Sequence, residues 1–104
     1  MSGYDFHPEA RTDLDEIHEY ICQDNADAAD RVISDILAAV RDLVSFPYKG
    51  HCRPDLTSHA LRFWRVRDYL IAYAPDETPL LVIAVIHGSR SPRVMAAILR
   101  GREE

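Results

Sequence analysis

Lysine and cysteine are scarce in this chain of 104 residues, and it has no long apolar run. Its two cysteines, Cys22 and Cys52, do not form a CxxC pair, which favours free thiols in a reducing cytoplasm over a disulfide scaffold. No apolar run approaches the roughly 20 residues that cross a bilayer, and the first residues lack the basic and apolar regions of a signal peptide. We therefore expect a cytoplasmic protein that neither spans a membrane nor is exported.

The composition is that of a folded protein. Apolar residues make up 47% of the chain and charged residues 28%, a balance that excludes a disordered or low-complexity sequence. No repeat and no linker-like stretch divides the sequence, and a chain of this length provides one core of useful size. We therefore expect residues 1–104 to form a single domain.

Charge is distributed unevenly along the chain, whose formal net charge is −5. Residues 1–47 hold eleven acidic residues against three arginines, whereas residues 48–104 hold nine basic residues against six acidic ones. A net acidic protein is a poor candidate for wrapping nucleic acid, which is usually bound by strongly basic surfaces. The second half could still present a cationic face to a partner, or simply carry solvated arginines.

Apolar residues at helical spacing mark two segments of the first half. After a brief strand over residues 4–6, Pro8 suits the first turn of an amphipathic helix of about 15 residues. The sequence gives this helix an apolar face and a polar face, formed respectively by Ala10, Leu14, Ile17 and Ile21 and by Asp13, Asp15, Glu16 and Glu19. Asp24 or Asn25 can cap a second helix over residues 26–45. So short a break between two helices predicts an antiparallel hairpin.

The second half has the signals of strands and turns. Residues 48–59 contain glycine and proline without periodicity and predict a loop. Residues 60–66 and 69–73 predict two strands joined by a tight turn. Residues 80–86 form a continuous apolar run, which is typical of a central strand.

A short helix is expected at the end of the chain. Ser91 and Pro92 suit the cap and first position of a helix over residues 92–100, which we expect Gly101 to end. Strands and helices are thus segregated in the order β-α-α-β-β-β-α. This order predicts an α+β fold in which a helical hairpin packs on one face of a mainly antiparallel sheet.

The succession of these segments resembles the RelE/ParE superfamily of type II toxin–antitoxin toxins. The resemblance extends over residues 4 to 90 and rests on an ordered set of short segments. These are Pro8-Glu9-Ala10, residues 13–17 with Tyr20-Ile21, residues 29–31, Leu43 with Phe46-Pro47 and Gly50, Arg62, residues 69–73, and residues 85–90. The resemblance implies a small cytoplasmic toxin that a co-expressed antitoxin keeps silent.

The resemblance leaves two activities open, because a shared fold does not carry function. RelE-like members cleave mRNA on the ribosome, which needs an acid, a base and cations in one place. Here His87, Arg62 and Arg90 could supply them, although His87 could merely cap its strand. ParE-like members are known for poisoning DNA gyrase without cleaving RNA. The single lysine, the absence of tyrosine after Tyr73 and the acidic charge favour this ParE-like, non-catalytic activity.

An antitoxin partner is the other implication of the resemblance. Such antitoxins resemble ParD, a ribbon-helix-helix dimer followed by an acidic amphipathic tail that folds on the toxin. DNA would then be contacted only through the antitoxin. An apolar groove with an arginine rim suits the tail, and the candidates for it are Ala28, Val32, Arg62, Trp64, Arg65 and Arg67. Val32 also suits a plain core position, and the cations and aromatics of residues 62–67 could instead stack nucleic-acid bases.

One loop contains side chains of the types that bind metals. His51, Cys52, Asp55 and His59 lie close together in the sequence but match no recognised ligand spacing. Their occurrence together is therefore explained by chance. We expect neither a metal nor another cofactor.

Overall fold

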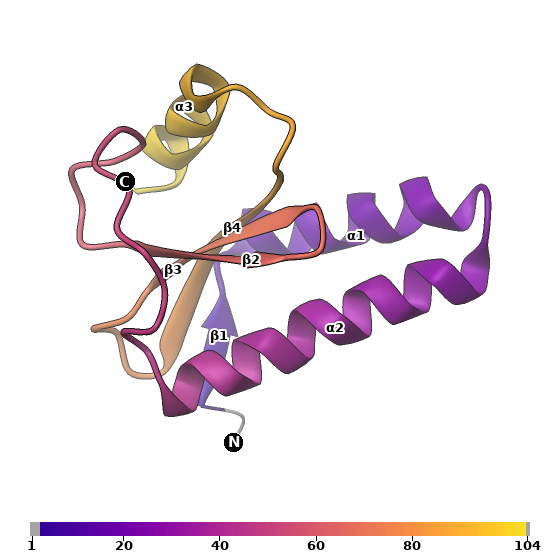
Figure 1. Ribbon diagram of the computed structural model, residues 1–104, viewed down its shortest axis with the longest axis horizontal. Coiled ribbons are helices and arrows are strands. Elements are labelled where there is room, and N and C mark those ends of the chain that lie inside the picture. The colour runs from indigo at the N-terminus through magenta and orange to yellow at the C-terminus, as the bar shows by residue number, and fades with distance from the viewer. Residues whose placement is uncertain (1–2, 104) are drawn as a thin grey trace.

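The computed structural model describes residues 3–103 and has the expected α+β architecture (Figure 1). The elements follow one another in the order β1 Tyr4–Phe6, α1 Pro8–Cys22, α2 Ala26–Ser45, β2 Arg62–Val66, β3 Tyr69–Ala74, β4 Leu80–His87 and α3 Pro92–Arg102. The sequence therefore predicts every element, with strand ends displaced by one or two residues.

The four strands form one sheet in the order β1-β4-β3-β2. β2, β3 and β4 are joined by short turns and pair antiparallel, whereas β1 pairs parallel with β4. β1 is only three residues long and its pairing ends where Phe6 meets Val82. The remainder of β4, up to His87, therefore has a strand neighbour on one side only.

The helical hairpin covers one face of the sheet. Its α2 helix buries a stripe of apolar residues formed by Ala29, Val32, Ile36, Val40 and Leu43. All of these residues except Ala29 pack in one cluster with the sheet residues Ile71, Tyr73, Val82 and Val85. The turn between α1 and α2 projects beyond the sheet (Figure 1). Burying these side chains contributes about 25 cal/mol per Å² of apolar surface and is the main force that holds the hairpin in place.

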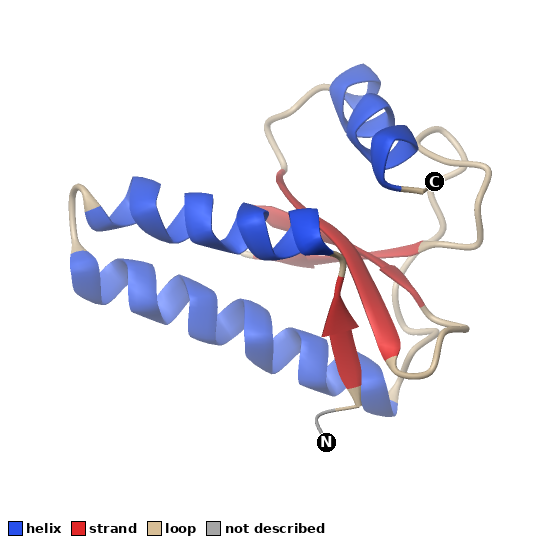
Figure 2. Cartoon of the chain, turned by 180° about the vertical axis from the view of Figure 1, so that it is seen from behind, coloured by secondary structure: helices blue, strands red, loops and turns tan. Residues whose placement is uncertain are grey.

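The opposite face of the sheet has a second, smaller core. Met95 and Leu99 of α3 pack there against Phe63, Ile83 and Ile86. Figure 2 shows α3 set apart from the hairpin, across the sheet from it. The alternation of residues along a strand explains both cores, because Phe63 faces α3 whereas its neighbour Trp64 packs on the hairpin side.

The helix starts follow the predicted capping, but the end of α3 does not. Asn25 accepts a hydrogen bond from the Ala28 N–H, and Ser91 accepts one from the Val94 N–H. The prediction that Gly101 ends the last helix is wrong, because α3 continues to Arg102. Gly101 keeps a negative φ, and the side chain of Arg102 is held by partners outside the helix.

Candidate functional site

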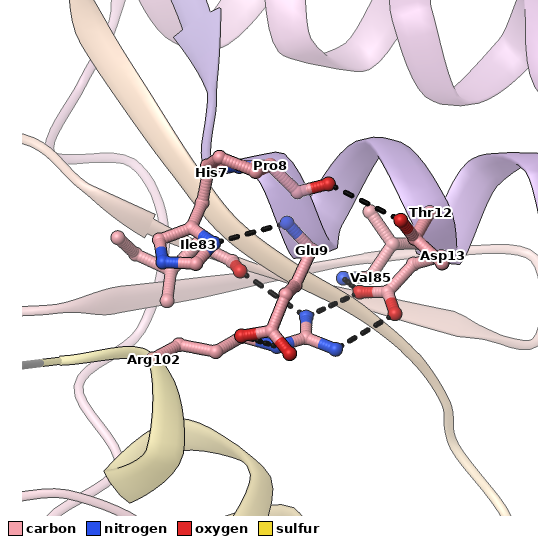
Figure 3. A network of polar contacts seen from close by, with 8 residues as sticks. All are labelled: His7, Pro8, Glu9, Thr12, Asp13, Ile83, Val85 and Arg102. Atoms are coloured by element: carbon pink, nitrogen blue, oxygen red, sulfur yellow. Dashed lines mark hydrogen bonds and ion pairs between the residues drawn. The ribbon is translucent and has the colours of Figure 1, made fainter.

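Two charged side chains, Asp13 and Arg102, bond to main-chain groups of β4 beyond the point where β1 ends (Figure 3). Asp13 of α1 accepts a hydrogen bond of 2.9 Å from the Val85 N–H, and Arg102 of α3 donates one of 3.2 Å to the Ile83 carbonyl. These two main-chain groups belong to the side of β4 that has lost its strand neighbour. The pair thus replaces part of a missing strand and ties α1, β4 and α3 together.

The guanidinium of Arg102 binds Asp13 in a bidentate way. One of its two bonds, from Nη2 to Oδ1, measures 2.9 Å, and the side chains of Arg102 and Asp13 are only 11% and 15% exposed. Glu9 lies 3.8 Å from the same guanidinium. The hydrogen bond to Asp13 and the charges of Asp13 and Glu9 raise the pKa of Arg102 and keep it charged.

Helical spacing assigned Asp13 to the polar face of α1, and that assignment is wrong. The side chain turns inward to Val85 and Arg102. The sequence held one signal of this, because Asp13 stands three residues after Ala10 and four before Ile17, which are both apolar-face positions.

An open cleft of about 570 Å³ lies beside this pair. Ile17 and Tyr20 of α1 line one wall, Ile98 of α3 lines another, and the end of β4 with His87 lies between them. The loop after β4 adds Arg90. The structure therefore brings His87 and Arg90 together, while α1 and Tyr20 are a part of this site that the sequence did not reveal.

Hydrogen bonding and aromatic contact orient His87 in this cleft. Its Nδ1 accepts a hydrogen bond of 3.0 Å from the Ser89 N–H, so Nε2 is the nitrogen left to carry a proton. Its ring meets the Tyr69 ring edge to face at 5.2 Å between centroids. Burial, together with the charge of Asp68, raises the pKa of Tyr69, which is therefore a neutral phenol at physiological pH.

Arg62 lies away from His87 and Arg90. It pairs in register with Tyr73, whereas His87 pairs with Tyr69, four residues away along β3. This offset alone is about 13 Å at the rise of a β-strand. The guanidinium of Arg62 donates to the carbonyls of Tyr48 (3.1 Å) and Gly50 (2.8 Å). The three residues that could cleave RNA thus do not form one cluster.

The residues predicted to contact an antitoxin occupy several surfaces. Ala28 is half-buried in the first turns of α2, and Val32 is 7% exposed and belongs to the core of the hairpin. Arg67 lies in the β2–β3 turn with a φ of 54° and donates to Asp35 of α2 at 2.7 Å. Arg65 is exposed. Because it follows Trp64 directly in β2, its side chain faces the opposite side of the sheet from Trp64.

Trp64 is the centre of a cluster of aromatic and cationic side chains. The Lys49 ammonium lies 4.3 Å from the centroid of its ring, and His51 stacks on it at 6.3 Å. Nearby, Arg62 lies over the ring of Tyr48, which is 57% exposed. The sequence identified Trp64 and Arg62, but it could not show that residues 48–51 of the loop return to β2.

The candidate metal residues of the loop point to different partners. His51 stacks on Trp64, Asp55 binds Arg53, and His59 contacts Glu103 at 3.2 Å. Across residues 3–103, no three histidine, cysteine, aspartate or glutamate side chains are placed to hold a metal ion together.

Comparison with known proteins identifies one family. Residues 4–92 match the family described as ParE toxin of type II toxin-antitoxin system, parDE. No curated protein matches the sequence. In the described part of the chain, none of the helices is both long enough and apolar enough to cross a membrane.

Proposed function

Because the chain belongs to the ParE toxin family of type II toxin–antitoxin systems, we propose that it inhibits DNA gyrase by direct contact and that a ParD-like antitoxin silences it. In this proposal the toxin blocks its target by binding and performs no chemistry of its own. The observation that carries the proposal is the separation of Arg62 from His87 and Arg90. Cleavage of RNA without a metal needs an acid, a base and cations around one phosphate.

Charge and coverage of the sheet also favour binding over RNA cleavage. The formal net charge of −5 opposes the approach to ribosomal RNA. The face of the sheet opposite the hairpin is covered by α3, with Met95 and Leu99 buried against it. Neither face is thus open to an RNA strand along its whole width.

One observation favours a second candidate function, a RelE-like mRNA endonuclease. His87 and Arg90 share a cleft, and His87 has its Nδ1 occupied by Ser89, so that Nε2 could serve in proton transfer. Among the described arginines that line this cleft, only Arg90 could be the supporting cation, since Arg102 is engaged by Asp13. This arrangement is poorer than the three-residue set that the sequence suggested.

A supercoiling assay tests the proposal. We expect the purified chain to inhibit supercoiling by purified gyrase, because its target is a protein surface, and to leave mRNA intact on translating ribosomes. The His87→Ala, Arg90→Ala double variant should retain the inhibition, since neither side chain performs chemistry in this proposal. Unchanged supercoiling without a trapped cleavage complex would remove gyrase as the target, and ribosomal mRNA cleavage lost in the double variant would establish the endonuclease.

Exposed apolar and cationic groups support the antitoxin part of the proposal. Tyr20 is 73% exposed and Phe46 is 61% exposed, which is unusual for large hydrophobic side chains. Arg65 lies near the end of β2, and Arg67 lies in the β2–β3 turn, where it reaches Asp35 of α2. A tail that reaches both Trp64 and Arg65 must pass around β2, because these side chains lie on opposite faces.

The arginine rim gives the second test. We expect Arg65→Glu to slow association with the antitoxin about tenfold at low salt, because a rim charge steers an acidic tail toward its site. Stopped-flow kinetics at several salt concentrations measure this effect, which should shrink as salt is added. The control is Arg100→Glu, which makes the same charge change at an exposed position of α3. Equal slowing by both variants would show a net-charge effect and would contradict the assignment of Arg65 to the rim.

A further inference from the structure

The end of β4 is an open strand edge inside the cleft. Successive residues of a strand point their main-chain groups to opposite sides. The Gly88 N–H points toward β3, since it donates to the Asp68 carbonyl at 2.6 Å. The Val85 N–H points away from β3, since it donates to Asp13. The main-chain groups of Val85 and His87 therefore face the side on which β1 has ended.

Two of these groups have no partner within residues 3–103. The Ile83 carbonyl and the Val85 N–H are bound by Arg102 and Asp13, and the His87 carbonyl accepts from the Arg90 N–H at 3.1 Å. The Val85 carbonyl and the His87 N–H receive no such partner in this part of the chain. They are an acceptor and a donor on residues whose Cα atoms are about 7 Å apart along the strand, and both point to the same side, where another extended chain can bond to them.

We propose that an extended segment of the antitoxin tail pairs with β4 at Val85–His87 and adds a short strand to the sheet. The inference rests on the proposed function, because it names the place where that antitoxin binds. Main-chain pairing at a sheet edge is a recurring mode of peptide recognition. This edge is available because Asp13 and Arg102 bind only the Val85 N–H and the Ile83 carbonyl. The Val85 carbonyl and the His87 N–H are left open to another chain.

The walls of the cleft select a single extended chain as the occupant. α1 with Tyr20 and α3 with Ile98 stand on either side of the edge. A second copy of this protein would have to bring its own β4 edge into the cleft, and that edge lies between the same two helices. A flexible tail has no such helices beside it and orders itself as it binds.

The side chains around the edge specify the chemistry of the segment. Ile17, Tyr20 and Ile98 offer apolar contact to residues on either side of the added strand. Arg90 forms no ion pair within residues 3–103 and can receive a carboxylate. Glu16 on the α1 wall repels a second carboxylate there. The segment is thus apolar, with one acidic residue near the loop that follows β4, which agrees with an acidic amphipathic tail.

Amide hydrogen exchange of the wild-type chain tests the inference directly. The probe is the ParD-like antitoxin of the proposed function, added in excess until size-exclusion chromatography shows a complex. We expect the His87 amide to exchange at least tenfold more slowly in the complex, while the Gly88 amide, already bonded to Asp68, changes little. A complex in which His87 exchanges as before would overturn the edge pairing and leave the proposed function standing. Absence of any complex would overturn both.

A matched pair of variants separates the main chain of His87 from its side chain. His87→Pro removes the N–H that faces the cleft, whereas His87→Ala keeps it and removes only the imidazole. We expect His87→Pro to weaken antitoxin binding about tenfold relative to His87→Ala, as measured by calorimetry. Equal affinities of the two variants would overturn the inference. The exchange experiment decides the matter by itself if the proline variant does not fold.

Discussion

We expect the Arg102→Ala variant to lose about 3 kcal/mol of its free energy of unfolding, because removal of one partner leaves a buried charge uncompensated. Asp13 is 15% exposed and would keep its carboxylate without a counter-ion. The same substitution frees the Ile83 carbonyl, an unsatisfied group that adds to the loss. Folded domains are stable by only about 5–15 kcal/mol, so this loss is large.

Urea denaturation measures this effect, and two controls define its cause. Arg102→Lys keeps the charge but not the bidentate geometry, so it should fall between the wild type and the alanine variant. Arg100→Ala removes an exposed arginine from the same helix and should change the unfolding free energy by less than about 0.5 kcal/mol. If Arg100→Ala and Arg102→Ala are equally destabilising, the pair with Asp13 has no special role.

We expect Gly50→Ala to destabilise the protein by about 3 kcal/mol through crowding of a buried tyrosine. A Cβ atom on Gly50 would lie 2.3 Å from the Tyr73 hydroxyl and 3.0 Å from the Phe63 carbonyl. Tyr73 is fully buried, and its hydroxyl accepts from the Gly50 N–H at 3.0 Å and donates to the Pro47 carbonyl at 2.7 Å. Displacing the ring would break both bonds as well as the packing around it.

Thermal and urea unfolding measure this effect against a glycine with open surroundings. A Cβ on Gly101 would meet no atom within 4 Å, and Gly101 lies inside α3. Gly101→Ala should therefore stabilise the protein by about 0.5–1 kcal/mol, in keeping with helix propensity. In a Tyr73→Phe background the cost of Gly50→Ala should fall, because the nearest clashing atom is gone. Similar stabilities of the two alanine variants would contradict the crowding.

Local sequence patterns were sufficient to predict the elements of this fold. The apolar spacing of α1 and α2, the caps at Asn25 and Ser91 and the apolar run of β4 are properties of neighbouring residues. The end of α3 was mispredicted for a physical reason. A glycine often ends a helix, but here the next residue, Arg102, is held in place by Asp13, which is 89 positions away in the sequence.

The candidate sites depend on such distant contacts and were only partly predictable. His87 and Arg90 are neighbours in the chain and remain together in the cleft, whereas Arg62 is separated from them by the register of β3. The walls provided by Tyr20 and Ile98 come from helices whose placement no local pattern gives. The arginines of β2 face both sides of the sheet because side chains alternate along a strand, which the sequence itself already implies.

The stacking around Trp64 has a practical consequence. This chain has one tryptophan, which lies on β2 in contact with Lys49 and His51. Ultraviolet emission of the indole therefore originates from a single place in the molecule. The chain therefore carries an intrinsic optical reporter on β2, and any change in the surroundings of that strand can be followed without attaching a dye.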